Sequence, residues 1–248
     1  MRRTLTALGL STCLLAAPAM ALDLSSMSEE ERANFRAEVR AYLLENPEVL
    51  MEAIAVLEGR EAQAAAEADR DLAAANKALL TADERDWVGG NPEGDITVVE
   101  FIDYRCGFCR RAHPEVAELI ETDGNIRLIV KEFPILGEQS MLASRFALSV
   151  LATEGDAAYK RVSDALIALR SDVTETSLSA LSDAFGYDTE AILAGMEDEA
   201  ISRKLADNRA LAQSMQITGT PTFVIGGEML RGYAPLEAMR EIVAEERG

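Results

Sequence analysis

Two cysteines with the spacing Cys-x-x-Cys are the residues of this chain best suited to chemistry. Cys106 and Cys109 directly follow a predicted strand and open a predicted helix. The unpaired N–H groups and the dipole at a helix N-terminus favour an anion, and the thiolate is the nucleophile of disulfide exchange. We therefore expect Cys106 to be the exposed nucleophile, with a depressed pKa. Cys109 is expected to be the buried thiol that attacks a mixed disulfide at Cys106 and releases the substrate.

Two other interpretations of this pair are weaker. A structural zinc site needs four ligands, and His113 is the one histidine that could join the two thiols. An inert disulfide between such close residues closes almost no loop and adds little stability. Arg105, Arg110 and Arg111 either help to hold a thiolate or form a solvated helix face. We expect His113 to cap or pack and not to catalyse.

A single carboxylate, Glu100, interrupts an otherwise apolar predicted strand. A strand of this composition is expected to be buried on both faces. Burial without a partner raises the pKa of a carboxyl, and such shifted groups are frequent at functional sites. The alternative interpretation is an ordinary ion pair with a nearby cation such as Lys131.

The composition disfavours two classes of partner. The chain has 248 residues and a formal net charge of −19, from 24 basic and 43 acidic side chains. Nucleic acids and anionic membrane surfaces bind proteins through clustered lysine and arginine. We therefore expect no nucleic-acid partner and interpret the charge as a source of solubility.

The first residues are typical of a cleavable signal peptide over residues 1–21. Arg2 and Arg3 give a positive start, and a short apolar stretch leads to a small-x-small cleavage site, Ala19-Met20-Ala21. Cys13 suggests a lipoprotein signal, but the residues before it fit that pattern poorly. Cleavage leaves only the Cys-x-x-Cys pair, which in an exported protein favours redox chemistry over a disulfide scaffold. We therefore expect the mature chain in the periplasm.

Residues 22 to about 86 are predicted to be helical and not globular. Ser28 followed by Glu31 is a capping box that starts one helix, and Asn46, before Pro47, is the expected N-cap of the next. The second helix is predicted to be unbroken except at Gly59, and it carries a thin apolar stripe, whose main residues are Leu50, Ile54, Leu57, Leu72 and Leu79. One helix cannot bury such a stripe, so we expect this segment to join copies of the chain into a homo-oligomer.

Residues 87–248 alternate strands with helices. Strands are predicted at 96–104, 126–133, 222–225 and 229–231, the last two joined by a hairpin turn at Gly226-Gly227. Helices are predicted at 106–122, in several segments across 138–216, and from Pro235 onwards; residues 89–94 are predicted to be a turn. The order indicates an α/β fold with a mixed sheet and a helical insertion.

Several stretches of the chain resemble DsbA-like thioredoxin-fold proteins of bacterial envelopes. They are residues 98–104 leading into the cysteine motif, 110–114, 131–137 and 219–224. The resemblance covers about residues 87–248 and implies a thioredoxin-like mixed sheet with a helical insertion. Residues 42–50 are similar to the oligomerising N-terminal region of ScsC/Com1-like members.

The resemblance also implies roles for individual residues. Thr220-Pro221 matches the active-site cis-proline, where Thr220 would offer its backbone N–H and C=O to a substrate strand. Glu100, six positions before Cys106, matches an acidic residue that assists proton transfer at Cys109. Phe108 is expected to contact substrate. The dipeptide between the cysteines lacks the charge of the strongly oxidising members, which suits reduction or isomerisation.

The expected function is thiol–disulfide exchange on misfolded or unfolded secreted proteins, as a disulfide isomerase or reductase. The resemblance implies a membrane redox partner that recycles the cysteine pair, and no cofactor or metal. A net disulfide oxidase is one alternative, and a copper(I)-handling protein that uses the two thiolates as soft ligands is another. A trimer is the first expectation for the oligomer, by the same resemblance, and a dimer the second.

Overall fold

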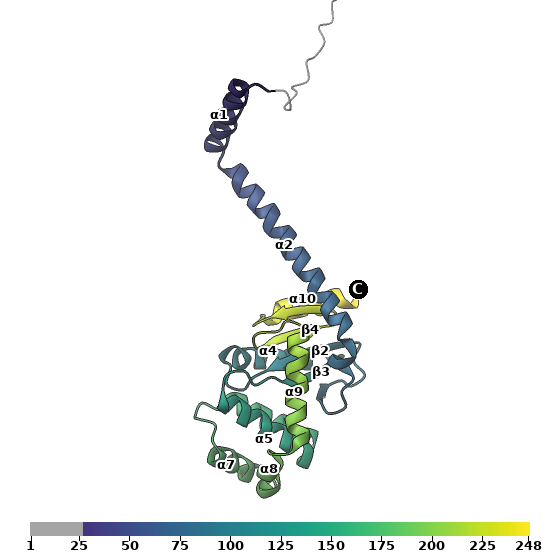
Figure 1. Cartoon of the computed structure of the whole chain (residues 1–248). Coiled ribbons are helices and arrows are strands. Elements are labelled where there is room, and N and C mark those ends of the chain that lie inside the picture. Colours follow the sequence, from purple (N-terminus) through teal and green to yellow (C-terminus); the bar gives the residue numbers. More distant parts are fainter. Residues whose placement is uncertain (1–26) are drawn as a thin grey trace, which may run out of the picture. The chain divides into compact units, whose positions relative to one another are not determined.

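The computed structural model describes residues 27–248, so the expected signal peptide and Cys13 lie outside the described residues. Contacts within the chain divide it after Gly59 into two units, whose described parts are residues 27–59 and Arg60–Gly248 (Figure 1). Within residues 27–248, no helix combines the length and apolar character needed to cross a bilayer.

The first unit contains α1 (Glu29–Glu45) and the first part of α2 (Glu48–Ala75). The predicted capping box is confirmed: the Glu31 N–H donates to Ser28 Oγ over 3.3 Å, and the Ser28 N–H donates to the Glu31 carboxylate over 2.8 Å. The role predicted for Asn46 is wrong. Its side-chain amide donates to the Tyr42 carbonyl over 2.9 Å, so Asn46 closes α1.

The apolar side chains of these two helices lack a core of their own. No residue of α1 is buried. The large exposed apolar side chains of the segment are Phe35, Val39, Tyr42, Leu44, Leu50, Met51, Ile54, Val56 and Leu57. Exposed apolar surfaces of this kind are typical of interaction sites. Oligomer formation by this segment stays a prediction.

The predicted second helix breaks at Asn76. The Asn76 side chain donates to the Leu72 carbonyl over 2.9 Å and so competes with the helical backbone pattern. A short helix, α3 (Lys77–Thr81), follows. Ala73 and Leu80 are buried in the core of the second unit. Part of the sequence that we predicted as a free helical segment thus packs against the sheet.

The second unit is built on a five-stranded mixed sheet with the order β1-β3-β2-β4-β5. Its strands are β1 (Trp87–Gly90), β2 (Ile96–Ile102), β3 (Ile126–Glu132), β4 (Thr222–Ile225) and β5 (Glu228–Arg231). Strands β2 and β3 are parallel, and the other neighbours are antiparallel. This confirms the predicted fold class.

Strand β1 was missed because its glycines were interpreted as a turn. Trp87 folds its ring over Gly89, where a Cβ would meet the ring at 2.2 Å. Gly90 has a positive φ of 67° and lies against the backbone of Ile126. The two glycines therefore permit close packing inside a strand that pairs with β3.

Helices cover both faces of the sheet. They are α3, α4 (Gly107–Asp123), α5 (Glu138–Glu154), α6 (Asp156–Ala168), α7 (Glu175–Phe185), α8 (Thr189–Gly195), α9 (Glu199–Ser214) and α10 (Leu236–Arg247). Val98 and Ile102 face the core that contains α4, α10 and the helices α5–α8. Val99 and Phe101, which alternate with them along β2, face α3 and the end of α9. The first of these cores surrounds the cysteines.

Candidate active site

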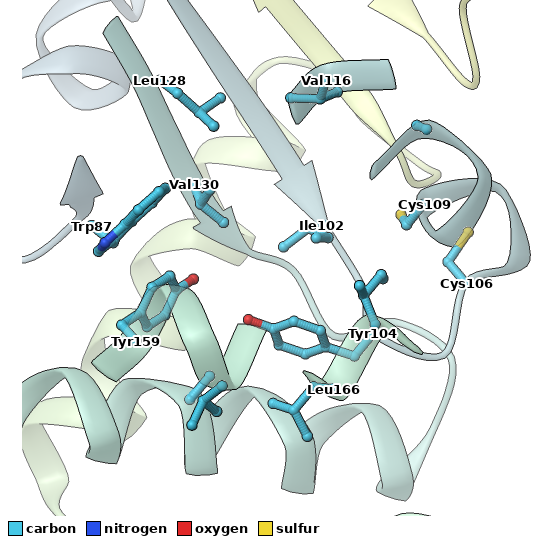
Figure 2. Close-up of a cluster of buried hydrophobic side chains, with 14 of the residues drawn as sticks. Trp87, Ile102, Tyr104, Cys106, Cys109, Val116, Leu128, Val130, Tyr159 and Leu166 are labelled. Carbon is cyan, nitrogen blue, oxygen red and sulfur yellow. The ribbon is translucent and has the colours of Figure 1, made fainter. Parts of the chain in front are cut away.

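Strand β2 delivers the cysteine pair to the start of α4. Cys106 is the N-cap of α4, with extended backbone angles, and Cys109 lies one turn further along (Figure 2). Both are free thiols in this structure. Cys109 is fully buried, whereas Cys106 is 7% exposed. The prediction of an exposed Cys106 is therefore too strong, because the residue is almost entirely buried.

The two thiols are electrostatically unlike. The pKa of Cys106 is lowered to about 5, mainly by a hydrogen bond with the Cys109 side chain. The backbone N–H groups of Cys109 and Phe108 lower it further, whereas burial opposes them. The pKa of Cys109 is raised well above its usual range by the same bond to Cys106, by burial and by the nearby Glu100. At neutral pH, Cys106 is a thiolate and Cys109 a thiol.

The segment before β4, which contains Thr220 and Pro221, lies against Cys106. The peptide bond Thr220-Pro221 is cis, as the resemblance implied. The Thr220 carbonyl oxygen lies 3.1 Å from Cys106 Sγ. This confirms that the segment contacts the first cysteine, although the two lie 114 positions apart in the chain. Substrate binding by Thr220 and Pro221 stays a prediction.

Glu100 is buried on the same sheet face as the cysteines and is 2% exposed. Its carboxyl oxygen Oε1 has no hydrogen-bond partner among the described residues. Burial and the charge of Glu132 raise the pKa of Glu100 to about 8. The alternative pairing with Lys131 is wrong. Lys131 alternates to the opposite face of β3 and binds Asp86 there.

The basic residues near the motif contact neighbouring elements, although Arg111 is exposed, and Arg110 lies close enough to Cys106 to interact with its charge. Arg110 donates to the carbonyls of Ile167 and Leu169, and Arg105 donates to that of Ser171. Arg111 stacks over the ring of Tyr233 at 4.2 Å. These contacts join α4 to its neighbours.

His113 has a structural role near the motif, as expected. Its Nε2 lies 2.8 Å from the Asp164 carboxylate, and burial lowers its pKa. Across residues 27–248, no cluster of three or more His, Cys, Asp or Glu side chains is arranged to hold a metal ion.

Asp103 supports the site and was not anticipated. Its buried carboxylate accepts the backbone N–H groups of Arg105, Ile135 and Leu136 over 2.8, 2.8 and 3.0 Å. It thereby fixes the loop that leads into Cys106 against the loop that follows β3. An aspartate next to a strand end was the only available signal, since the loop it binds is some 32 positions away.

Two large apolar side chains remain exposed next to this arrangement. Phe108, between the cysteines, is 60% exposed, and Leu136, in the loop bound by Asp103, is also exposed. Phe108 offers an apolar surface two positions from Cys106 in the chain, and Leu136 offers another on the loop that Asp103 holds.

A thioredoxin-like sheet with a dithiol at a helix start and a cis-proline segment against it defines a thiol–disulfide oxidoreductase. The comparison with known families agrees: residues 97–244 match the DSBA-like thioredoxin domain. The chain belongs to this family. Residues 31–64 match the family described as the copper resistance protein ScsC N-terminal domain.

Solved structures resemble the chain over much of its length. A thioredoxin-like oxidoreductase from Silicibacter pomeroyi is 37% identical, with a TM-score of 0.65. The match covers 69% of this chain and 98% of that protein's chain. BcfH from Salmonella enterica Typhimurium is 29% identical, with a TM-score of 0.73. The match covers 88% of this chain and 97% of the BcfH chain.

Curated relatives include much longer proteins. The Na(+)/H(+) antiporter NhaA 1 of Salinispora arenicola is 28% identical over 160 residues. The match spans 64% of this chain and 24% of that protein. The chain thus spans about a quarter of the length of the first curated relatives that it matches.

Proposed function

We propose that this protein is a periplasmic disulfide isomerase or reductase that acts on misfolded or unfolded secreted proteins. Cys106 is the attacking thiolate, Cys109 is the resolving thiol, and the Thr220-Pro221 segment lies beside the bound substrate. The contrast between an ionised Cys106 at the start of α4 and a buried, protonated Cys109 supports this assignment.

The exchange begins when the Cys106 thiolate attacks one sulfur of a substrate disulfide. A bond forms between Cys106 and that sulfur, and the other substrate sulfur leaves as a thiolate. If the freed thiolate attacks a different substrate disulfide, it displaces another substrate thiolate. When that thiolate attacks the substrate sulfur bound to Cys106, a new substrate disulfide forms and Cys106 leaves as a thiolate, so the substrate is rearranged with no net change in electrons. If Cys109 loses its proton and attacks Cys106, the substrate leaves reduced and a Cys106–Cys109 disulfide forms. The second route needs a reductant, which we assign to a membrane partner.

The side chains around Cys106 suit an unfolded substrate. An unfolded polypeptide presents apolar side chains and an unpaired backbone. Phe108 and Leu136 supply exposed apolar area, and the backbone next to Pro221 supplies polar groups beside the sulfur. The uncharged Gly107-Phe108 dipeptide favours a less oxidising disulfide than a charged one would.

A net disulfide oxidase is the second candidate, and one observation favours it. A Cys106 pKa of about 5 stabilises the reduced form, which makes the corresponding disulfide easier to reduce. The same thiolate serves an isomerase that a partner keeps reduced. The redox state in the cell therefore separates the two functions, and copper titration of the reduced protein tests the copper(I) alternative.

The deciding experiment traps the thiols of the periplasmic fraction with acid and alkylates them. A predominantly reduced Cys106–Cys109 pair, together with reactivation of scrambled ribonuclease by the purified protein, supports the isomerase or reductase. A predominantly oxidised pair and rapid oxidation of reduced substrate support the oxidase. A Cys106→Ala variant is the matched control for both assays.

A further inference from the structure

Two buried glutamates share the sheet face behind the cysteines. Glu100 on β2 pairs in register with Val130 on β3, and Ile102 pairs with Glu132. Glu132 is therefore two residues further along the neighbouring strand, on the face where Glu100 lies. Both are nearly inaccessible to solvent, with exposed fractions of 2% and 1%. Two negative charges on neighbouring strands of an apolar core repel each other, so ionisation of both carboxyls is unfavourable.

The two carboxyls differ in their hydrogen-bond partners. Glu132 accepts hydrogen bonds from the hydroxyls of Tyr104, Tyr159 and Ser144 over 2.7, 2.6 and 2.6 Å. Figure 2 shows the hydroxyls of Tyr104 and Tyr159 pointing toward one another, and the Glu132 carboxylate binds both. Three hydroxyl donors stabilise an ionised carboxylate, because each can donate to its oxygens.

Glu100 has no comparable set of donors. Its Oε1 is buried without a hydrogen-bond partner among the described residues. Glu100 lines a cavity of about 180 Å³ together with His113, Lys160 and Ser163. Ser163 is also within 3.3 Å of the Tyr104 hydroxyl, so hydroxyl groups extend from Glu132 to the cavity that Glu100 lines. The cavity is large enough for water and offers it polar partners.

The other charged groups among the described residues that face Glu100 do not neutralise the negative charge of Glu100 and Glu132. On α4 they are Cys109, His113 and Glu121. On α6, Lys160 lies at the cavity, but its ammonium group is bound by Asp164, which also binds His113. Strands β1 and β4 present Trp87 and Phe223, which carry no charge. Asp103 adds a further negative charge near Glu132.

We propose that Glu132 is a positioning residue for proton transfer: as a carboxylate stabilised by three hydroxyls, it disfavours a second negative charge on Glu100 until Cys109 exchanges its proton. This inference rests on the proposed roles of Glu100 and Cys109 and extends them to a second carboxylate. Burial raises the pKa of Glu132 only to about 7, while the hydroxyls of Ser144, Tyr159 and Tyr104 oppose the increase.

The two carboxyls act at one step of the exchange, the proton transfer to or from Cys109. When substrate thiolate attacks the oxidised pair at Cys106, Cys109 leaves as a thiolate and takes the proton of Glu100. In the reverse direction, the Glu100 carboxylate accepts the Cys109 proton as Cys109 attacks the mixed disulfide, and one S–S bond replaces another. Glu132 neither gives up nor takes a proton in either direction. Its charge sets the pH at which Glu100 changes from donor to acceptor.

The test compares wild type with Glu132→Gln, Glu100→Gln and Ser144→Ala in the full reduced protein. Infrared difference spectra against Glu100→Gln isolate the carbonyl band of protonated Glu100 and give its titration midpoint. We expect Glu132→Gln to move that midpoint to lower pH by about one unit, and Ser144→Ala to move it in the same direction by less. Ser144→Ala keeps both carboxyls, so it tests the pair if Glu132→Gln fails to fold.

A kinetic measurement on the same variants reports the proton transfer itself. A mixed disulfide of Cys106 with glutathione is resolved by Cys109, and glutathione release is followed against pH. At about pH 7, between the pKa of Glu132 and the wild-type midpoint, we expect Glu132→Gln to release glutathione about fivefold faster, because more of Glu100 is ionised. Glu100→Gln should lose that titration.

A lower stability of Glu132→Gln with an unchanged infrared midpoint overturns the proposal and leaves Glu132 a structural role. A shifted midpoint in a protein that proves to be an oxidase supports the carboxyl pair and rejects only the isomerase assignment, since the titration requires no substrate.

Discussion

Cys106 Sγ lies 3.1 Å from the carbonyl oxygen of Thr220, so the thiol of Cys106 donates to that oxygen when it is protonated. Ionisation removes this hydrogen bond, because a thiolate has no proton to donate. The pKa of Cys106 is nevertheless lowered, since the Cys109 thiol and the backbone N–H groups at the start of α4 favour the anion. The carbonyl of Thr220 is then free to accept an N–H from a substrate backbone next to the reacting sulfur.

The first prediction concerns the order of thiol labelling. Iodoacetamide should modify Cys106 of the reduced protein first, with a rate that titrates near pH 5 and not near the ordinary thiol value of 9. Cys109→Ala should raise the pKa of Cys106, because the Cys109 thiol makes the largest contribution to lowering it. Mass spectrometry of labelled peptides over a pH series measures both. Preferred labelling of Cys109 would contradict the assignment.

The second prediction concerns Asp103. Asp103→Asn retains one acceptor oxygen but places an amide donor against backbone donors, so we expect a loss of about 2–3 kcal/mol in the free energy of unfolding. Because Asp103 fixes the loop that carries Leu136, exchange with a protein substrate should slow more than exchange with a small disulfide. Leu136→Ala is the control, since it should slow protein exchange while leaving stability nearly unchanged. Equal slowing with both substrates would argue against a loop-positioning role.

The third prediction is a pH dependence of stability. The pKa of Glu100 is raised from 4.5 to about 8, so the folded chain holds this proton more tightly than the unfolded chain does. Glu100 therefore favours the fold below pH 4.5, and that contribution is lost as the pH rises through 8. Glu100→Gln should be more stable than wild type at about pH 9, by on the order of 5 kcal/mol, and similar at about pH 4. Urea unfolding at both values measures this, and a constant difference would exclude Glu100 as the cause.

Local patterns were sufficient to predict part of the fold and site. The Ser28–Glu31 capping box and the strand from Thr222 to Ile225 are set by neighbouring residues, and the structure contains both. Cys106 lies at a helix start for the same kind of reason, since the chain passes directly from strand β2 into α4. Such features depend on contacts within a few positions of the chain.

Features built from distant residues could not be predicted. The donors to Glu132 lie 12 to 28 positions away and come from the turn after β2, from α5 and from α6. Lys131 binds Asp86 across 45 positions, which removed it as a partner for Glu100. Strand β1 depends on a tryptophan ring lying over a glycine, and a turn-forming composition hides that packing. In each case the deciding partner is supplied by the fold.

Oligomer formation by the N-terminal helices is the fourth prediction. Light scattering on the mature chain should give a trimer, or a dimer as the second expectation, at micromolar concentration. Leu50→Lys with Ile54→Lys should dissociate it, because both side chains belong to the exposed apolar set. Glu52→Lys, on the same helix and outside that set, is the matched control. A monomeric mass for the unmodified mature chain would refute the oligomer and the isomerase argument that depends on it.

The last prediction separates two deletions that the sequence alone would treat as equivalent. Deleting residues 22–59 removes α1 and the first part of α2, so it should give a folded monomer that keeps dithiol exchange, loses isomerisation of scrambled substrate and shifts towards oxidation. Deleting residues 22–86 also removes Asp86, which binds the buried ammonium groups of Lys131 and Lys204. Unpaired buried charges cost about 3–5 kcal/mol, so the longer deletion should be much less stable. Thermal unfolding of both proteins, with Asp86→Asn in the full chain as control, measures the difference; equal stability of the two deletions would show that the Asp86 pairs contribute little.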